Sequence, residues 1–111
     1  MKFALLLYED DALRVAKSAE EVSVCLAYAA AMEKAGILVG GERLRPAETA
    51  ATVRIGSGAT RVLDGPYVEA KEQLGGFHLI DVPDLDTALA WARRCPSAQR
   101  GRVEVRAIWP T

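Results

Sequence analysis

Residues 63–77 read LDGPYVEAKEQLGGF, and this stretch decides how the rest of the chain is interpreted. It opens with a tight-turn triplet in which Asp64 is expected to cap its own backbone, Gly65 to supply unusual dihedral angles and Pro66 to fix φ. Charged side chains and a glycine pair follow before the next strand-like run. This density of turn and charge signals is unusual for an ordinary surface loop and indicates a specific structural or functional role.

Strand-like runs lie on both sides of this stretch. Residues 52–55 and 60–63 alternate around the turn residues 56–59, a pattern typical of a β-hairpin. Residues 2–8 are apolar on both alternating faces, as expected of a strand that is covered on two sides. Three more strands are predicted at residues 37–39, 77–80 and 102–109, and residues 43–51 are expected to be irregular.

Two helices are predicted between these strands. Ser18 and Glu21 form a capping box that starts the first helix. This helix runs to about residue 35, where Gly36 is the expected left-handed terminator. Its predicted apolar stripe consists of Val22, Cys25, Leu26, Ala29 and Met32. Asp84 is the expected N-cap of the second helix.

The resulting order is strand–helix–strand, a hairpin, and then strand–helix–strand. This order predicts one α+β domain over residues 1–111 with a ferredoxin-like fold, in which two helices cover one face of an antiparallel sheet. The strand at residues 2–8 nevertheless offers large apolar side chains on both faces. Since an uncovered apolar face would be a sticky patch on a monomer, we expect a homodimer in which two sheets pack face to face.

The composition is ordinary for a soluble globular protein, because 50% of the 111 residues are hydrophobic, 26% are charged and the net charge is −1. This balance argues against a broad basic surface, so direct binding to nucleic acid or to an anionic membrane is not expected. The apolar run at residues 3–8 is too short for a secretory signal, and no stretch approaches the ~20 apolar residues of a membrane helix. The sequence therefore predicts a cytoplasmic protein.

Cys25 and Cys95 fall in helix-like segments without the C-x-x-C spacing of a redox or metal motif. We expect both to be reduced, buried residues that behave as small hydrophobic groups. No recurring ligand spacing predicts a metal centre, and no glycine-rich loop between a strand and a helix predicts a cofactor. The sequence therefore predicts neither a metal nor a cofactor.

The motif that runs from Asp64 to Phe77 resembles that of the DGPF branch of the YCII-related protein family. The resemblance continues through the first strand, through AGILVGGE at residues 35–42, through LIDV at 79–82 and through VEVR at 103–106. It implies a dimeric α/β barrel of ferredoxin-like subunits, in agreement with the periodicity. It also implies a role whose chemistry is largely unassigned in the family, and DGPF relatives are often found alongside extracytoplasmic-function sigma factors.

Two features depart from the family pattern. YCII members carry a histidine in the first helix, which is proposed to work with an aspartate as an acid–base site. The first helix of this chain holds no histidine, so the resemblance does not carry that chemistry over. Tyr67 replaces the usual phenylalanine, which keeps the aromatic ring and adds a hydroxyl group.

The charged residues of the motif are the main candidates for catalysis. We predict catalytic roles for Asp64 and Lys71, joined by Glu42 if the strand that precedes it ends beside this loop. A carboxylate in a cleft can act as a general acid or base, and Lys71 would orient an anionic substrate. The alternative is that Asp64 only caps the turn and that Lys71 pairs with Glu69 or Glu72 on the surface.

Five further side chains are predicted to bind a ligand, namely Tyr67, Glu69, Glu72, His78 and Arg106. His78 is the single histidine and, on a strand, shares a face with Ile80. It is a candidate proton carrier, or else a packed imidazole. Arg106, which alternates with Glu104 on the last strand, is a candidate anion ligand, or else a member of a cross-strand ion pair. Trp109 is expected in the core or in an interface.

Two functions of different class follow from these residues. The first is a cofactor-free enzyme that binds a small molecule and transfers protons, as an isomerase or a lyase does. The second is a non-catalytic accessory or sensor protein that binds a small molecule or partners a transcription regulator such as a sigma factor. A third interpretation, in which the motif is architectural and closes the dimer, stays open.

Overall fold

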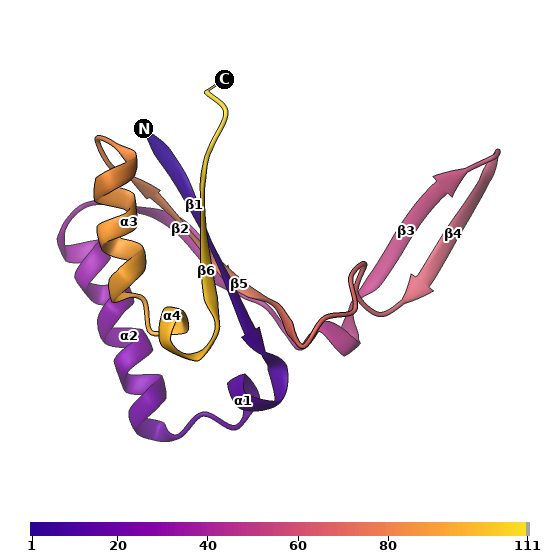
Figure 1. The fold of residues 1–111 in the computed structure, drawn as a ribbon, viewed down its shortest axis with the longest axis horizontal. Coiled ribbons are helices and arrows are strands. Elements are labelled where there is room, and N and C mark those ends of the chain that lie inside the picture. Colours follow the sequence, from indigo (N-terminus) through magenta and orange to yellow (C-terminus); the bar gives the residue numbers. More distant parts are fainter. Residues whose placement is uncertain (111) are drawn as a thin grey trace.

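The computed structural model describes residues 1–110 and contains a four-stranded antiparallel sheet with the strand order β2–β5–β1–β6. Its strands are β1 (Lys2–Asp10), β2 (Leu38–Arg43), β5 (Glu72–Asp81) and β6 (Arg102–Ala107). Helices α2 (Ala19–Lys34) and α3 (Leu85–Arg94) lie on the same side of this sheet (Figure 1). The predicted ferredoxin-like α+β fold, with helices on one face of an antiparallel sheet, is confirmed.

Local capping determines where the helices begin and end. Ser18 Oγ accepts a hydrogen bond from the Glu21 amide at 3.1 Å, and the Glu21 carboxylate accepts one from the Ser18 amide at 3.2 Å. The Asp84 side chain accepts a hydrogen bond from the Thr87 amide at 2.8 Å at the start of α3. Gly36 follows α2 with a φ of 75°, in the left-handed conformation that glycine tolerates. These cap predictions are confirmed.

Several segments differ from the sequence prediction. Strand β5 begins at Glu72 rather than at Phe77, because the glycine pair continues the backbone pairing: Gly76 lies opposite both Leu7 of β1 and Arg43 of β2. The sequence prediction, which starts this strand at residue 77, is therefore wrong for residues 72–76. Three short helical segments are not predicted by the sequence, since they are too short to show a periodicity: α1 (Asp11–Val15), α4 (Ser97–Arg100) and a 3-10 helix at Ala47–Thr49.

Strands β3 (Ala51–Gly56) and β4 (Ala59–Asp64) form a separate two-stranded sheet, which confirms the predicted hairpin. Its turn residues Ser57 and Gly58 both have positive φ, as a type I′ turn requires. We call residues 51–64 the arm, because they extend away from the main sheet (Figure 1). The arm explains why the radius of gyration is 15.7 Å, above the ~13 Å expected of a compact chain of similar length.

The Asp-Gly-Pro triplet closes the base of the arm through the backbone. The Gly65 amide donates a hydrogen bond to the Ala50 carbonyl at 2.7 Å, and the Thr52 hydroxyl donates to the Gly65 carbonyl at 2.9 Å. Gly65 has a φ of 99°, which residues with a Cβ rarely adopt. The expected cap by Asp64 is wrong, since its exposed side chain makes no hydrogen bond within residues 1–110.

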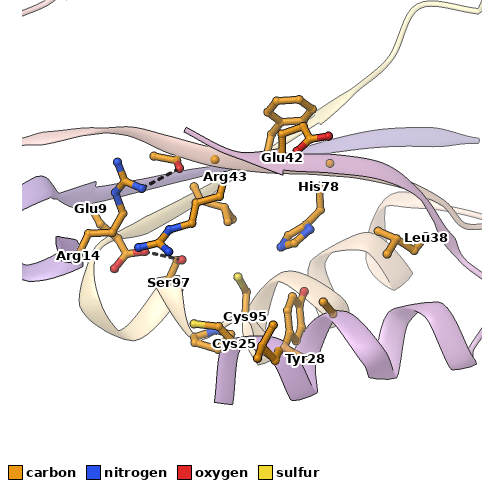
Figure 2. A pocket seen from close by; sticks show the side chains of 18 of the residues that line it. Glu9, Arg14, Cys25, Tyr28, Leu38, Glu42, Arg43, His78, Cys95 and Ser97 are labelled. Atoms are coloured by element: carbon orange, nitrogen blue, oxygen red, sulfur yellow. Dashed lines mark hydrogen bonds between the residues drawn. The ribbon is translucent and has the colours of Figure 1, made fainter. Parts of the chain in front are cut away.

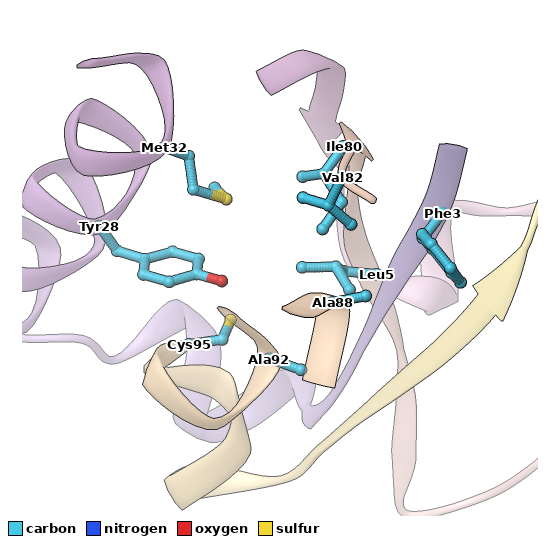
Figure 3. Close-up of a cluster of buried hydrophobic side chains, with 9 residues drawn as sticks. All are labelled: Phe3, Leu5, Tyr28, Met32, Ile80, Val82, Ala88, Ala92 and Cys95. Carbon is cyan, nitrogen blue, oxygen red and sulfur yellow. The ribbon is translucent and has the colours of Figure 1, made fainter. Parts of the chain in front are cut away.

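The hydrophobic core lies between the helices and the inward face of the sheet (Figure 3). Its side chains are Phe3, Leu5, Tyr28, Met32, Ile80, Val82, Ala88, Ala92 and Cys95. The predicted stripe of α2 is partly wrong, because Val22 and Leu26 are 38% and 67% exposed and Tyr28 is buried instead. Tyr28 can be buried because its hydroxyl donates a hydrogen bond to the Trp91 carbonyl at 2.7 Å.

We call the opposite face of the sheet the open face, because the helices α2 and α3 lie on the other side (Figure 1). Leu6 lies on the open face between Phe77 of β5 and Glu104 of β6. Leu6 and Phe77 are only half-buried, and the apolar surface that they share is the one that motivates a dimer. Trp109 is 89% exposed and so lies outside the core of this chain. None of the helices within residues 1–110 has the length and apolarity that crossing a membrane requires.

Candidate functional site

A cavity of about 400 Å³, which we call the pocket, lies between α2 and the inward face of the sheet (Figure 2). Two glycine pairs on neighbouring strands border it, at residues 40–41 of β2 and 75–76 of β5. Cys25 and Tyr28 border it from α2. Because glycine has no side chain, the part of the wall that these residues form is bare backbone.

His78 projects from β5 into the pocket, toward Tyr28 (Figure 2). The two rings meet edge-on with their centroids 5.8 Å apart. Burial lowers the pKa of His78 below its ordinary value of 6.5, so the imidazole is neutral at neutral pH. Within residues 1–110 its side chain makes no hydrogen bond. A neutral imidazole with free ring nitrogens can accept a proton from a bound molecule or donate one to it.

Two other titratable groups near His78 stay protonated. Burial raises the pKa of the Tyr28 hydroxyl far above its ordinary range, and this hydroxyl is already bonded to a backbone carbonyl. Burial also raises the pKa of the Cys95 thiol. Neither group is suited to act as a base near neutral pH, whereas the imidazole of His78 is.

Polar side chains meet at the other end of the pocket, in a group that we call the Glu9 cluster. Glu9, Lys17 and Ser97 line the pocket, and Arg100 joins the cluster through its bond to Glu9. Glu9 is the last inward-facing residue of β1 and is 3% exposed. Its carboxylate accepts hydrogen bonds from Ser97 Oγ at 2.8 Å and from Arg100 Nε at 2.9 Å, and Lys17 Nζ lies 3.7 Å away. Burial alone would raise the pKa of Glu9, but these bonds and the charge of Lys17 outweigh it and hold that pKa below its ordinary value.

Arg14 brings another cation to this end of the pocket and is 3% exposed. Its Nη1 donates to the carbonyls of Leu44 at 2.7 Å and Gly75 at 3.2 Å. Its Nε and Nη2 donate to Asp11 Oδ1 at 3.2 and 3.0 Å. A Cβ at Gly75 would lie 2.6 Å from the Arg14 Nε, so the guanidinium fits only because position 75 has no side chain.

The pocket and a second hollow contain four of the predicted site residues. His78 points into the pocket, whereas Glu42 borders it and points its carboxylate to the opposite side of the sheet (Figure 2). Lys71 and Glu72 border a separate hollow beside β1, where the Glu72 carboxylate lies 3.2 Å from Arg102 Nε. The structure thus brings Lys71 and Glu72 together but keeps them apart from His78.

The other predicted site residues lie away from the pocket within one chain. Asp64 ends the arm and Glu69 follows in the next loop; both are exposed, and Tyr67 is 88% exposed. Arg106 forms an ion pair with Glu104 of its own strand, so the pair is not the cross-strand one that the alternative interpretation predicts. The catalytic and ligand-binding roles predicted for these residues stay predictions.

Sequence reasoning missed the Glu9 cluster, Arg14 and Tyr28. Only Glu9 gave a usable signal, since positions 3, 5 and 7 of its strand face are apolar and position 9 continues the alternation with a carboxylate. A charge at an inward position implies buried partners. Within residues 1–110, no group of three or more histidine, cysteine, aspartate and glutamate side chains is arranged to hold a metal ion.

Comparisons with other proteins agree with this architecture. The family model of the YCII-related domain matches residues 1–111. An uncharacterized protein of Rhizobium meliloti (strain 1021) is 41% identical over 114 residues, which cover 97% of this chain and 92% of that protein.

A solved structure with the same fold is 5-chloro-2-hydroxyhydroquinone dehydrochlorinase from Burkholderia phenoliruptrix AC1100, in complex with 2,5-dihydroxybenzoquinone. The TM-score is 0.56 at 14% identity, and the match covers 98% of this chain and 94% of that chain. At this level of identity, the likeness shows a shared fold alone.

Proposed function

The chain belongs to the YCII-related domain family, and on that premise we propose that it binds a small molecule in the pocket and performs acid–base chemistry on it without a cofactor. His78 carries this proposal, because a half-buried, neutral imidazole faces a cavity that is large enough for a ligand. The imidazole would take a proton from an acidic C–H or O–H bond, and the electron pair would stay on the ligand as an enolate. Return of the proton to another atom gives isomerisation, and departure of a leaving group with the electron pair gives a lyase reaction.

The dehydrochlorinase of similar fold supplies a first probe. It is in complex with 2,5-dihydroxybenzoquinone, a small ring whose hydroxyl groups are acidic and whose ring hydrogens exchange when a ring carbon is protonated to the keto tautomer and then deprotonated. A molecule of this size suits a cavity of about 400 Å³. We therefore propose small, acidic, enolisable compounds as the ligands to test first.

Replacing His78 with glutamine is expected to slow the protein-catalysed exchange of the ring hydrogens of 2,5-dihydroxybenzoquinone with D₂O by about 100-fold or more. A positioned acid–base group contributes about 10²- to 10⁴-fold to a proton transfer. Proton NMR measures the exchange directly. With the unaltered protein, the rate should rise as the pH falls from 7 towards the lowered pKa of His78, because the imidazolium delivers the deuteron to a ring carbon of the anionic ligand and the imidazole then removes the ring proton.

The control for this variant is Lys34→Gln, which changes an exposed side chain at the end of α2 and should leave the exchange rate unchanged. Since the chain has 1 histidine, its imidazole NMR signals need no assignment and report the titration of His78 alone. A titration midpoint at or above 6.5, or unchanged exchange in His78→Gln, would count against catalysis by this residue.

A non-catalytic binding protein is the second candidate, and one observation favours it. No carboxylate orients the His78 imidazole within residues 1–110, since the carboxylate of Glu9 is held by Ser97 and Arg100. In this alternative, the protein senses a small molecule and partners a transcription regulator such as a sigma factor. Binding of 2,5-dihydroxybenzoquinone without hydrogen exchange would favour the sensor over the enzyme.

We further propose that the protein is a homodimer in which the open faces pack together and each arm lies against the other copy. Val53 and Val62 face each other across the arm, and Ile55 lies on the same side of it. These side chains are 62%, 64% and 74% exposed, and an isolated two-stranded hairpin is marginally stable in water. A second copy would cover the arm and would enclose the hollow beside Lys71, where the predicted catalytic roles of Asp64 and Lys71 could then apply.

Light scattering at micromolar concentration is expected to give twice the chain mass of 12.0 kDa. Ile55→Asp should shift the protein toward the monomer, because this side chain is 74% exposed in one chain and its substitution should not disturb that chain's own packing. Leu85→Asp is the matched control, since Leu85 is 51% exposed at the start of α3 on the side of the sheet away from the open face. A stable, non-aggregating monomer of the unaltered protein would contradict the dimer.

A further inference from the structure

We infer, on the basis of the ligand pocket proposed above, that the ligand is a small acid and that Lys17 binds its anionic group. The end of the pocket near the Glu9 cluster carries an excess of positive charge. Arg14, Lys17 and Arg43 all border the pocket. Glu9 is the carboxylate that faces it, since Glu42 points to the opposite side of the sheet (Figure 2).

Of the two cations at the pocket whose side chains are almost fully buried, Arg14 and Lys17, Lys17 has the weaker partners. Its side chain is 10% exposed, and its Nζ lies 3.7 Å from the Glu9 carboxylate, beyond ordinary hydrogen-bond distance. That carboxylate already accepts two short hydrogen bonds, from Ser97 and Arg100. The other contact of Nζ is the Cys25 sulfur at 3.8 Å, which is a weak acceptor. The ammonium group of this nine-tenths buried side chain, with its three N–H donors, therefore lacks a close oxygen acceptor.

Arg100 converges on the same sulfur atom. Its Nη2 lies 3.5 Å from Cys25 Sγ, so two cationic donors share one weak acceptor at the edge of the pocket. An anionic oxygen placed beside Cys25 would accept from both donors, and such charge-assisted hydrogen bonds are shorter and stronger than those to a thiol. Arg14 adds positive charge, but four of its five N–H donors already bond to Asp11 and to backbone carbonyls.

The other residues that line the pocket indicate that the rest of the ligand is apolar. Leu7, Leu38 and the Tyr28 ring are apolar surfaces that line the pocket. Leu38 lies on the far side of His78 from Glu9, and Tyr28 lies close to His78 (Figure 2). A carboxylate or enolate on a small ring would place its charge at Lys17 and its apolar part along these side chains. The imidazole of His78 would then face the part of the ligand that carries no charge.

Benzoate and benzamide test this inference, because they have nearly the same shape and differ in charge. Calorimetry with the unaltered protein is expected to show that benzoate binds at least about tenfold more tightly than benzamide. Lys17→Met should weaken benzoate binding by about tenfold and leave benzamide unchanged, whereas Lys17→Arg should retain part of the preference. Lys34→Met, at an exposed position, is the matched control and should change neither affinity.

The possible outcomes of these measurements distinguish the acid-binding pocket from the catalytic function. Equal affinities for benzoate and benzamide, or undetectable binding of both at millimolar concentration, would overturn the inference, as would an unchanged benzoate affinity in Lys17→Met. The comparison of the two probes on the unaltered protein decides the matter even if Lys17→Met does not fold. Benzoate binding that depends on Lys17, together with no hydrogen exchange at His78, would support the acid-binding pocket and contradict the catalytic function.

Discussion

Replacing Glu9 with glutamine is expected to lower the free energy of unfolding at pH 7 by about 3 kcal/mol. Glutamine keeps the shape of the side chain but removes the negative charge that Lys17 and Arg100 share. Removing one partner of a buried ion pair costs about 3–5 kcal/mol, and the low end applies because Arg100 keeps 20% of its side chain exposed. Urea unfolding followed by circular dichroism, at one fixed protein concentration, measures the difference.

The pH dependence of the same variant provides an independent check. The pKa of Glu9 is lower in the folded protein than its ordinary value of 4.5, so the unfolded chain binds more protons in the window between the two values. The stabilisation from Glu9 is therefore fully present above that window and is lost as the pH falls through the lowered pKa. The unaltered protein and Glu9→Gln should become more similar in stability in acid.

The matched control is Glu33→Gln, which alters an exposed glutamate on α2 and should change the free energy of unfolding by less than about 0.5 kcal/mol. If Glu9→Gln and Glu33→Gln were equally stable at pH 7, the Glu9 cluster would make no net contribution to folding.

The features of the fold that could be predicted are those with local causes. The capping box of Ser18 and Glu21 spans one helical turn, and the hairpin turn at Ser57 and Gly58 depends on two adjacent residues. The uncovered apolar surface could also be predicted, because the alternation of β1 itself shows large side chains on both faces. Such signals lie within a short window of sequence, so they do not depend on contacts with distant segments.

The candidate site could not be predicted in the same way, because its contacts join distant segments. Glu9 meets Ser97 and Arg100 across 88 and 91 positions of sequence, and no periodicity links them. The glycine pair of the motif suggests a loop when it is considered alone. In the structure, Gly75 is instead a strand residue whose missing side chain admits Arg14, from 61 positions away. The turn propensity of the glycine pair therefore predicted a loop where the structure has a strand.

Gly101→Ala is expected to destabilise the protein by about 3 kcal/mol, because the added methyl group would collide with the backbone of β1 beside Glu9. A Cβ at position 101 would lie 1.9 Å from the Tyr8 carbonyl oxygen and 3.0 Å from the Glu9 Cα. Both are backbone atoms of β1, which cannot turn away as a flexible side chain could. Thermal and urea unfolding measure the loss.

The close approach at Gly101 brings α4 against β1. The Gly101 amide donates to the Ser97 carbonyl at 2.8 Å at the end of α4, which holds Ser97 and Arg100 against the Glu9 carboxylate. Gly56→Ala is the matched control, since a Cβ there meets no atom within 4 Å. Equal stability of the two alanine variants would show that α4 can shift without cost. If the alanine at position 101 separates Glu9 from its partners, the double variant with Glu9→Gln should lose less stability than the sum of the two single losses.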